Sequence, residues 1–186
     1  LGGSEMCIRD SFYVTTDGVE ISGFTIKGAT DAWCAGIYLH RANNCVISHN
    51  SVMDNYIGVI AGFTDNNLIY HNEFRNNTIQ AYDNTGENLW DDGYPAGGNY
   101  WSDYTCIDAD GDGIGDVPYT DISGCAGATD RYPLCEVLVD PCELYDTNGT
   151  PGIQKDEAVK AIADYLIYHT IDKATAVAVL NCYFFG

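Results

Sequence analysis

The chain has 186 residues, of which 27 are acidic and 8 are lysine or arginine, so its formal net charge is -19. This balance excludes a nucleic-acid binder, which needs a basic surface, and disfavours contact with an anionic membrane. With 46% hydrophobic residues and 20 glycines the chain is expected to be globular, and no apolar run is long enough to span a membrane. The class that remains is an acidic protein outside the cytoplasm.

Residues 1–10 do not continue into the pattern that follows, and we expect them to be an artefact or unstructured. From Gly36 onward the sequence matches itself at an offset of 22 residues. A repeat this short cannot bury its own apolar face, so successive copies must stack. Residues 11–87 are therefore predicted to form three coils of a right-handed parallel β-helix, a mainly β fold. The pairs Asn50/Asn72 and Asn55/Asn77 are predicted to form amide ladders at its corners.

Three segments follow the repeats in a specific order: NLWDDGYPAGGNYWSDY (88–104), DADGDGIGDVPY (108–119) and DRYPL (130–134). Together with the repeats they resemble the β-helix repeat proteins of the NosD type, which share the carbohydrate-binding and sugar-hydrolase (CASH) fold. The resemblance covers residues 18–135. It implies the C-terminal end of such a β-helix in a prokaryotic surface protein.

Residues 88–140 are predicted to close the end of the β-helix, which would otherwise leave a sheet edge and a core exposed. Gly97 and Gly98 would allow a sharp turn in this cap. The aromatic residues available to cover the core are Trp90, Tyr94, Tyr100, Trp101 and Tyr104. The alternative is that these aromatic side chains stack on sugar rings.

The strongest chemical signal is an alternation of carboxylates along a glycine-rich turn in residues 108–116. Calcium takes about six to eight oxygen ligands, and this spacing matches the start of an EF-hand loop. We therefore predict calcium as the cofactor, with ligands from Asp108, Asp110, Asp112, the Ile114 carbonyl and Asp116. Tyr119 replaces the glutamate of position 12, so the loop is incomplete, and a solvated acidic turn is the alternative.

Residues 141–186 resemble a degenerate dockerin or EF-hand-like module, with amphipathic helices predicted over 155–168 and 173–184. Pro151 stands where the loop needs glycine, which weakens the case for a second calcium ion. The candidate ligands of this second loop are Asp146, Asn148, Thr150, Gly152 and Glu157. The resemblance implies docking onto another surface protein through a cohesin-like partner, and the alternative is a structural cap.

The chain has eight cysteines and no CxxC pair, which indicates an oxidising compartment rather than a zinc site. A disulfide between Cys106 and Cys125 is predicted around the acidic loop. Two further pairs are predicted, Cys142 with Cys182 in the tail and Cys34 with Cys45 across the first coil.

No group of residues identifies a catalytic site. Asp65 and Glu87 are a stacked acid pair, but no basic ladder lies beside them, which favours a solvated corner over sugar hydrolysis. His49 and His71 also stack, and the resemblance to NosD-type proteins implies that they are candidates for copper, although a surface pair without a third ligand is favoured. The sequence predicts an extracellular or cell-surface β-helix protein that binds calcium and a polysaccharide or another surface protein. The alternative is the C-terminal part of a polysaccharide lyase or hydrolase whose catalytic coils lie upstream.

Overall fold

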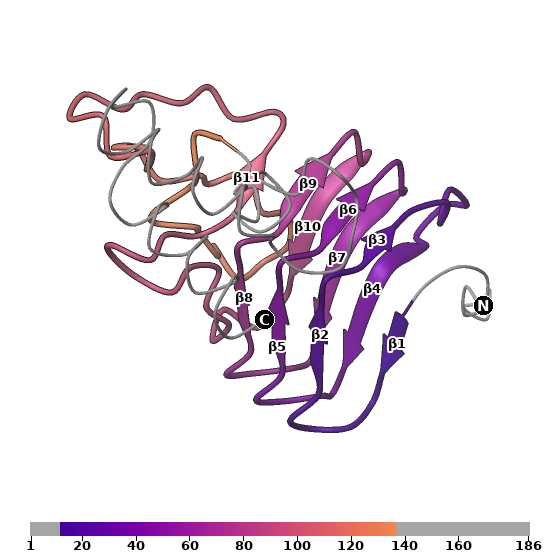
Figure 1. The fold of residues 1–186 in the computed structure, drawn as a ribbon. Helices are drawn as coiled ribbons and strands as arrows, with labels where there is room; N and C mark the ends of the chain where they lie inside the picture. Colours follow the sequence, from indigo (N-terminus) through magenta and orange to yellow (C-terminus); the bar gives the residue numbers. More distant parts are fainter. Residues whose placement is uncertain (1–11, 137–186) are drawn as a thin grey trace, which may run out of the picture. The chain divides into compact units, whose positions relative to one another are not determined.

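The computed structural model describes residues 12–136 (Figure 1). The chain divides into two units, residues 1–137 and 138–186, and the following account concerns the first. The dockerin-like module predicted for residues 141–186 lies outside the described residues, together with its candidate ligands and the cysteines Cys142 and Cys182.

Short strands in residues 12–136 form three parallel sheets. Sheet A contains β1 (Phe12–Val14), β4 (Ala35–His40), β7 (Ile57–Gly62) and β10 (Ile79–Asp83). Sheet B contains β2 (Glu20–Ser22), β5 (Val46–Ser48) and β8 (Leu68–Tyr70). Sheet C contains β3 (Thr25–Ile26), β6 (Ser51–Met53), β9 (Glu73–Arg75) and β11 (Tyr100–Trp101).

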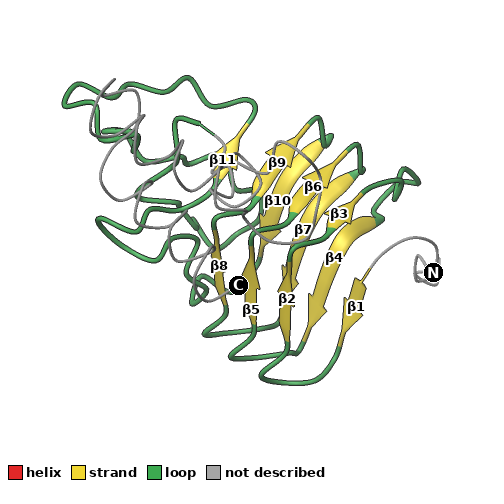
Figure 2. Cartoon of the chain, viewed as in Figure 1, coloured by secondary structure: helices red, strands yellow, loops and turns green. Residues whose placement is uncertain are grey.

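The chain visits sheets B, C and A in turn, three times over, so β2 to β10 make three coils of a parallel β-helix (Figure 1). Ile47 pairs with Ile69 and Ile37 with Val59, which is the predicted offset of 22 residues. Ile21 pairs with Ile47 at an offset of 26, because the first coil carries four extra residues before β4. The predicted parallel β-helix is confirmed. Strands and loops account for residues 12–136, with no helix among them (Figure 2), and hence none that could span a membrane.

The core is a set of side-chain columns that run through successive coils. Ile21, Ile47 and Ile69 form one column on sheet B, each almost completely buried. On sheet C, Ile26, Val52 and Phe74 form another, which continues into Trp101 of β11. Stacking of the same apolar position in each coil is what allows a short repeat to exclude water.

Two asparagine ladders run along the corners of the coils, as the sequence predicts. The Asn50 side-chain amide donates to Asn72 Oδ1 at 3.0 Å, and that of Asn55 donates to Asn77 Oδ1 at 3.1 Å. A third ladder, from Asn67 to Asn88, was not predicted and has a donor–acceptor distance of 2.8 Å. The amides of the two predicted ladders also donate to a main-chain carbonyl of the preceding coil, as in Asn72 to Ile47 O at 2.8 Å, whereas that of Asn67 donates to the Thr64 hydroxyl. The ladders therefore satisfy the polar groups that the tight corners bury.

The segment after β10 covers the end of the core, and stacked aromatic rings hold this cap against the last coil. The Trp101 ring lies between the rings of Phe74 and Tyr119, with centroid separations of 4.5 and 4.2 Å. Trp90 and Trp101 are each 1% exposed, so both indole rings are buried with the core residues. Tyr94 is different, because its side chain is 64% exposed and lies outside the core. Gly97 adopts a left-handed φ of 89°, as expected at the predicted turn.

The disulfide that closes the cap differs from the predicted pairing. Cys106 is bonded to Cys135, with the two Cα atoms 5.3 Å apart, whereas Cys125 is an exposed free thiol. The physical reason is that residues 113–114 pair with 134–135, which brings Cys135 beside the start of the acidic loop. The predicted Cys34–Cys45 bridge is also wrong: Cys34 is disulfide-bonded, but Cys45 is a buried free thiol whose amide donates to Asn67.

Candidate functional site

Two imidazoles stand above one another at the corner between sheets B and C. His49 and His71 occupy the same position in successive coils, with left-handed φ values of 56° and 54°. The main-chain amide of His49 donates to the carbonyl of His71, and that of His71 donates to Gly98 O. This ladder fixes the separation of the two rings, whose centroids are 5.2 Å apart at an interplanar angle of 80°. The corner thus holds both side chains at the edge of the molecule, with His49 exposed and His71 half-buried.

A carbonyl of the cap orients the His71 ring. His71 Nε2 lies 2.6 Å from Ala96 O, and because a carbonyl only accepts, Nε2 must carry the proton. In neutral His71 the Nδ1 atom therefore has the free lone pair. A histidine that binds a metal commonly donates its other ring N–H to a carbonyl in this way. Ala96 follows Pro95 in a loop closed by main-chain bonds such as Gly97 N to Gly93 O, and sequence reasoning did not identify its role.

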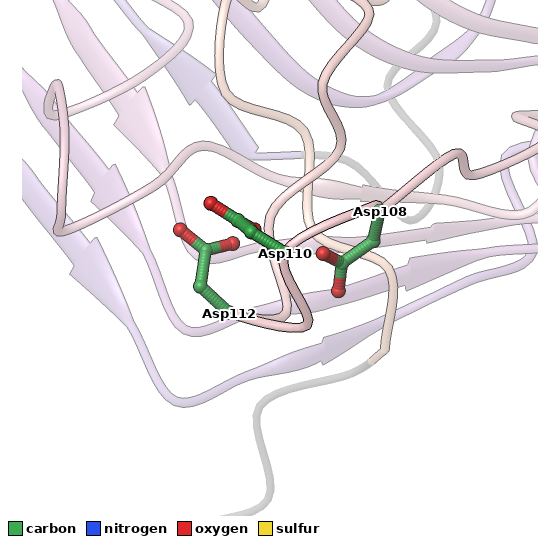
Figure 3. Close-up of side chains that lie close together, drawn as sticks. All are labelled: Asp108, Asp110 and Asp112. Carbon is green, nitrogen blue, oxygen red and sulfur yellow. The ribbon is translucent and has the colours of Figure 1, made fainter.

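The acidic loop brings three of its predicted ligands together (Figure 3). Carboxylate oxygens of Asp108, Asp110 and Asp112 lie within 4.8 Å of one another. Several of these oxygens already accept hydrogen bonds from the loop itself: Asp108 from the amides of Gly111 and Gly113, and Asp112 from that of Ile114. The Gly113 amide is the main cause that lowers the pKa of Asp108 below its ordinary value. The carboxylates thus cap the amides of a tight glycine turn.

The remaining predicted ligands of this loop have structural partners. Asp116 accepts a hydrogen bond from the Ala109 amide at 2.9 Å, which closes the loop across its base. Ile114 is 9% exposed and forms an antiparallel bridge with Leu134. The loop is therefore held by main-chain pairing and by the Cys106–Cys135 disulfide that brackets it.

The fold and the stacked imidazoles together define a parallel β-helix repeat protein with a candidate metal-binding corner. The chain belongs to the NosD family, described as "Periplasmic copper-binding protein (NosD)", which it matches over residues 9–106. It is 33% identical over 136 residues to a "Probable ABC transporter binding protein NosD" of Pseudomonas aeruginosa. The matched part covers 69% of this chain and 31% of that relative. No solved structure matches the chain.

The family match corrects the predicted cofactor. Calcium was predicted from the acidic loop, whereas the family is described as copper-binding, so the prediction of calcium as the cofactor is wrong. The physical reason is that alternating aspartates also suit a turn whose amides need acceptors, and this loop uses them in that way. An oxygen-only donor set is moreover typical of hard cations, while copper prefers imidazole and sulfur ligands. The periplasmic description of the family agrees with the predicted location outside the cytoplasm.

Proposed function

We propose that this chain is the β-helix part of a periplasmic copper-binding protein, and that His49 and His71 provide its copper ligands. The observation that carries the proposal is the edge-to-face contact of two imidazoles on successive coils, with ring centroids 5.2 Å apart. At this separation, two ring nitrogens can reach a common ion. The description of the family as copper-binding supports the choice of metal.

The distribution of other ligands within residues 12–136 favours these imidazoles. Cys106 and Cys135 are joined in a disulfide and cannot act as thiolates, and Cys45 is buried in the core. Cys125 is an exposed thiol whose Sγ lies 3.4 Å from Asn84 O. His40, on sheet A, has its Nδ1 atom 3.2 Å from the Tyr38 hydroxyl. The His49–His71 corner is the place where two imidazoles meet, and the Ala96 carbonyl already fixes the tautomer of one of them. Copper bound there would be held by neutral nitrogen ligands.

The similarity to the Pseudomonas aeruginosa protein supports a proposal about the partner of this chain. That protein is named as a binding protein of an ABC transporter, and we propose that this chain likewise works with a membrane transporter. The chain spans about a third of the length of that relative, so the activity of the whole protein is part of the proposal. Docking to a cohesin-like surface protein remains a prediction from the sequence.

A copper titration tests the proposed site. The full chain, with its disulfides oxidised, is titrated with Cu(I) against a chromophoric chelator, and separately with Cu(II) under electron paramagnetic resonance. His49→Ala and His71→Ala should each weaken copper binding at least tenfold, and the Cu(II) spectrum should lose one nitrogen coupling. The control is the triple variant Asp108→Asn, Asp110→Asn, Asp112→Asn, which should bind copper as the parent does. Unchanged copper affinity in the double histidine variant would show that copper binds elsewhere. Absence of copper binding by the parent chain would also overturn the proposed site.

A further inference from the structure

One loop of the cap holds His71 through two carbonyls. This loop, residues 92–98, is called the orienting loop below. Its Ala96 carbonyl lies 2.6 Å from Nε2 of the His71 ring, and its Gly98 carbonyl accepts the main-chain amide of His71 at 2.7 Å. Ala96 itself is exposed, so the place of its carbonyl depends on how the two ends of the loop are held.

A buried carboxylate, that of Asp130, holds the C-terminal end of the orienting loop. Asp130 Oδ2 accepts the Asn99 amide at 2.7 Å and the Trp101 indole N–H at 2.9 Å, and Oδ1 accepts the Tyr132 amide at 3.0 Å. The Gly98 amide in turn donates to the Tyr132 carbonyl at 2.7 Å. Packing here is so close that a Cβ atom at Gly98 would collide with the Asp130 carboxylate.

A second carboxylate, that of Asp91, holds the N-terminal end of the loop. Its side chain is 2% exposed and accepts the Gly93 amide at 3.0 Å. It also accepts the main-chain amide and Nε of Arg131, each at 3.0 Å. Residues 130–132 therefore bind both ends of the orienting loop, one through an aspartate of their own and the other through Arg131.

Of these two anchors, Asp130 has the more direct effect on the carbonyls that hold His71. It is 0% exposed, and both of its oxygens are occupied by N–H donors. Without this carboxylate, the donors of Asn99, Trp101 and Tyr132 would lack their acceptor, which is costly for buried groups. The backbone at the end of the orienting loop would then have to rearrange to recover hydrogen bonds.

We propose that Asp130 is a positioning residue for the His71 ring. Its carboxylate holds the end of the orienting loop, the loop keeps the Ala96 carbonyl on Nε2, and Nδ1 is thereby left to bind a metal ion. Groups that orient a histidine ligand typically change metal affinity by about 10- to 100-fold when they are removed. The consequence for copper rests on the proposed function, whereas the orientation of the ring does not.

Nitrogen-15 NMR of the full, copper-free chain at pH 8 tests the orientation of the ring. The chain has four histidines, so substitution of each in turn assigns the imidazole signals. We expect the parent to hold His71 in the Nε2–H tautomer alone and Asp130→Ala to show a mixture of both tautomers. Asp130→Asn keeps one oxygen acceptor and should restore most of the parent spectrum. A mixture in the parent, or an unchanged His71 tautomer in Asp130→Ala, would overturn the proposal.

Asp83→Ala is the matched control, because it also removes a buried acid that accepts an indole N–H. Asp83 is 0% exposed and accepts Trp90 Nε1 at 3.0 Å, and the donors to its carboxylate come from residues 85–90. Asp83→Ala should destabilise the chain without changing the His71 tautomer. A mixed tautomer in this variant too would reveal a general loosening of the cap and would contradict a specific role of Asp130.

A second variant covers the case in which Asp130→Ala does not fold. Gly98→Ala leaves the carboxylate in place but pushes the end of the orienting loop away from it. It should produce the same mixture of His71 tautomers. The parent tautomer in a folded Gly98→Ala chain would show that the Ala96 carbonyl does not depend on this contact, and the proposal would fail.

Titration with Cu(II) separates this inference from the proposed copper site. Asp130→Ala should weaken copper binding about tenfold, and Asp83→Ala should bind as the parent does. If the parent binds no copper, or binds it equally well without His49 and His71, the proposed function fails and the NMR result alone decides the role of Asp130. If copper binds through the two histidines and Asp130→Ala binds it as tightly as the parent, the copper site stands and the positioning role is wrong.

Discussion

The coils and the cap satisfy their buried polar groups with different chemistry. In the coils, a neutral amide both donates and accepts, so Asn50 and Asn72 can continue the same ladder from one coil to the next. Where the coils meet the cap, two of the three ladders end on carboxylates, which accept without donating, while the Asn55–Asn77 ladder ends on the Gln80 amide. Asn72 bonds to Asn99, and Asn99 donates its main-chain amide to Asp130 at 2.7 Å. The Asn67–Asn88 ladder ends in the same way on Asp83.

Each terminal carboxylate also accepts an indole N–H from the aromatic cap. Trp101 Nε1 donates to Asp130 at 2.9 Å, and Trp90 Nε1 donates to Asp83 at 3.0 Å. One buried acid therefore joins the end of a corner ladder to the ring that covers the core. Repetition can therefore stay neutral, whereas the ends of these two ladders introduce buried acids with their own energetic cost.

The largest expected effect is a pH dependence that is specific to the cap. Asp130 is 0% exposed, and burial raises its pKa to about 7 from an ordinary value of 3.8. The folded chain thus holds this proton more tightly than the unfolded chain, and the associated stability is lost as the pH rises towards about 7. The full change is on the order of 4 kcal/mol. Urea unfolding between pH 4.5 and 8 measures it.

Asp130→Asn provides the comparison for this pH dependence. The asparagine does not titrate, so the difference in unfolding free energy between wild type and variant should change with pH across this range. The other carboxylates titrate in both proteins and cancel in the difference. A difference that stays constant from pH 4.5 to 8 would mean that Asp130 has an ordinary pKa and that its hydrogen-bond donors outweigh its burial.

A second prediction concerns the Cys106–Cys135 disulfide, both cysteines of which lie in the cap. Cys106→Ala with Cys135→Ala should lower the unfolding free energy by about 3.5 kcal/mol, because a 29-residue separation is no longer closed in the unfolded chain. Hydrogen exchange should show the loss mainly at cap amides such as Gly115 and Cys135. Cys125→Ala, which removes an exposed free thiol, is the control and should change little. Equal loss of protection in β4 and β7 would contradict a cap-specific role.

Repetition also explains how much the sequence alone could predict. The 22-residue offset predicted the strand register and two of the ladders, because an asparagine in one coil has its partner at the same position of the next. The cap has no repeat, and its partners are far apart in sequence, as with Asn99 and Asp130. The pairing of Cys106 with Cys135 depends on such a contact, between residues 113–114 and 134–135, and sequence spacing favoured the nearer Cys125.

The candidate site shows the same limit. The stacking of His49 and His71 follows from the repeat, so the sequence predicted it, but the Ala96 carbonyl that orients His71 comes from the unrepeated cap. The acidic loop was misjudged for a related reason. Its carboxylates do converge, as predicted, but which main-chain amides they accept from depends on the exact turn, and this is not visible in residue spacing.

A third prediction tests the neutral ladder directly. Asn72→Ala removes a buried amide that donates to Ile47 O and Asn99 Oδ1 and accepts from Asn50. Several buried groups lose their partners, and we expect a cost of about 3 kcal/mol in unfolding free energy with no dependence on pH between 5 and 8. Asn66→Gly, at an exposed corner with a left-handed φ of 57°, is the control and should be nearly neutral. A loss at Asn72 no larger than at Asn66 would show that water replaces the ladder.

The smallest expected effect belongs to the ion pair that ties the two ends of the cap together. Arg131 donates through Nε and one terminal nitrogen to Asp91, whose side chain is 2% exposed, whereas that of Arg131 is 55% exposed. Burial by itself raises the pKa of Asp91, but the hydrogen bonds and charge of Arg131 lower it below its ordinary value. This stability is therefore present above about pH 4 and is lost as the pH falls through the pKa of Asp91 in the folded chain.

Arg131→Ala should cost only about 1 kcal/mol at pH 7, because the main-chain amides of residue 131 and Gly93 still donate to Asp91. The loss should shrink at pH values where Asp91 is protonated in both proteins. The matched control is Arg75→Ala on β9, whose partner Glu73 is more exposed, at 19%, and it should cost less at every pH. Thermal unfolding at pH 7 and pH 3 measures both variants. If Arg131→Ala costs as much as loss of the disulfide, the carboxylate of Asp91 depends on the guanidinium far more than its main-chain donors suggest, and the cap is held by this single pair.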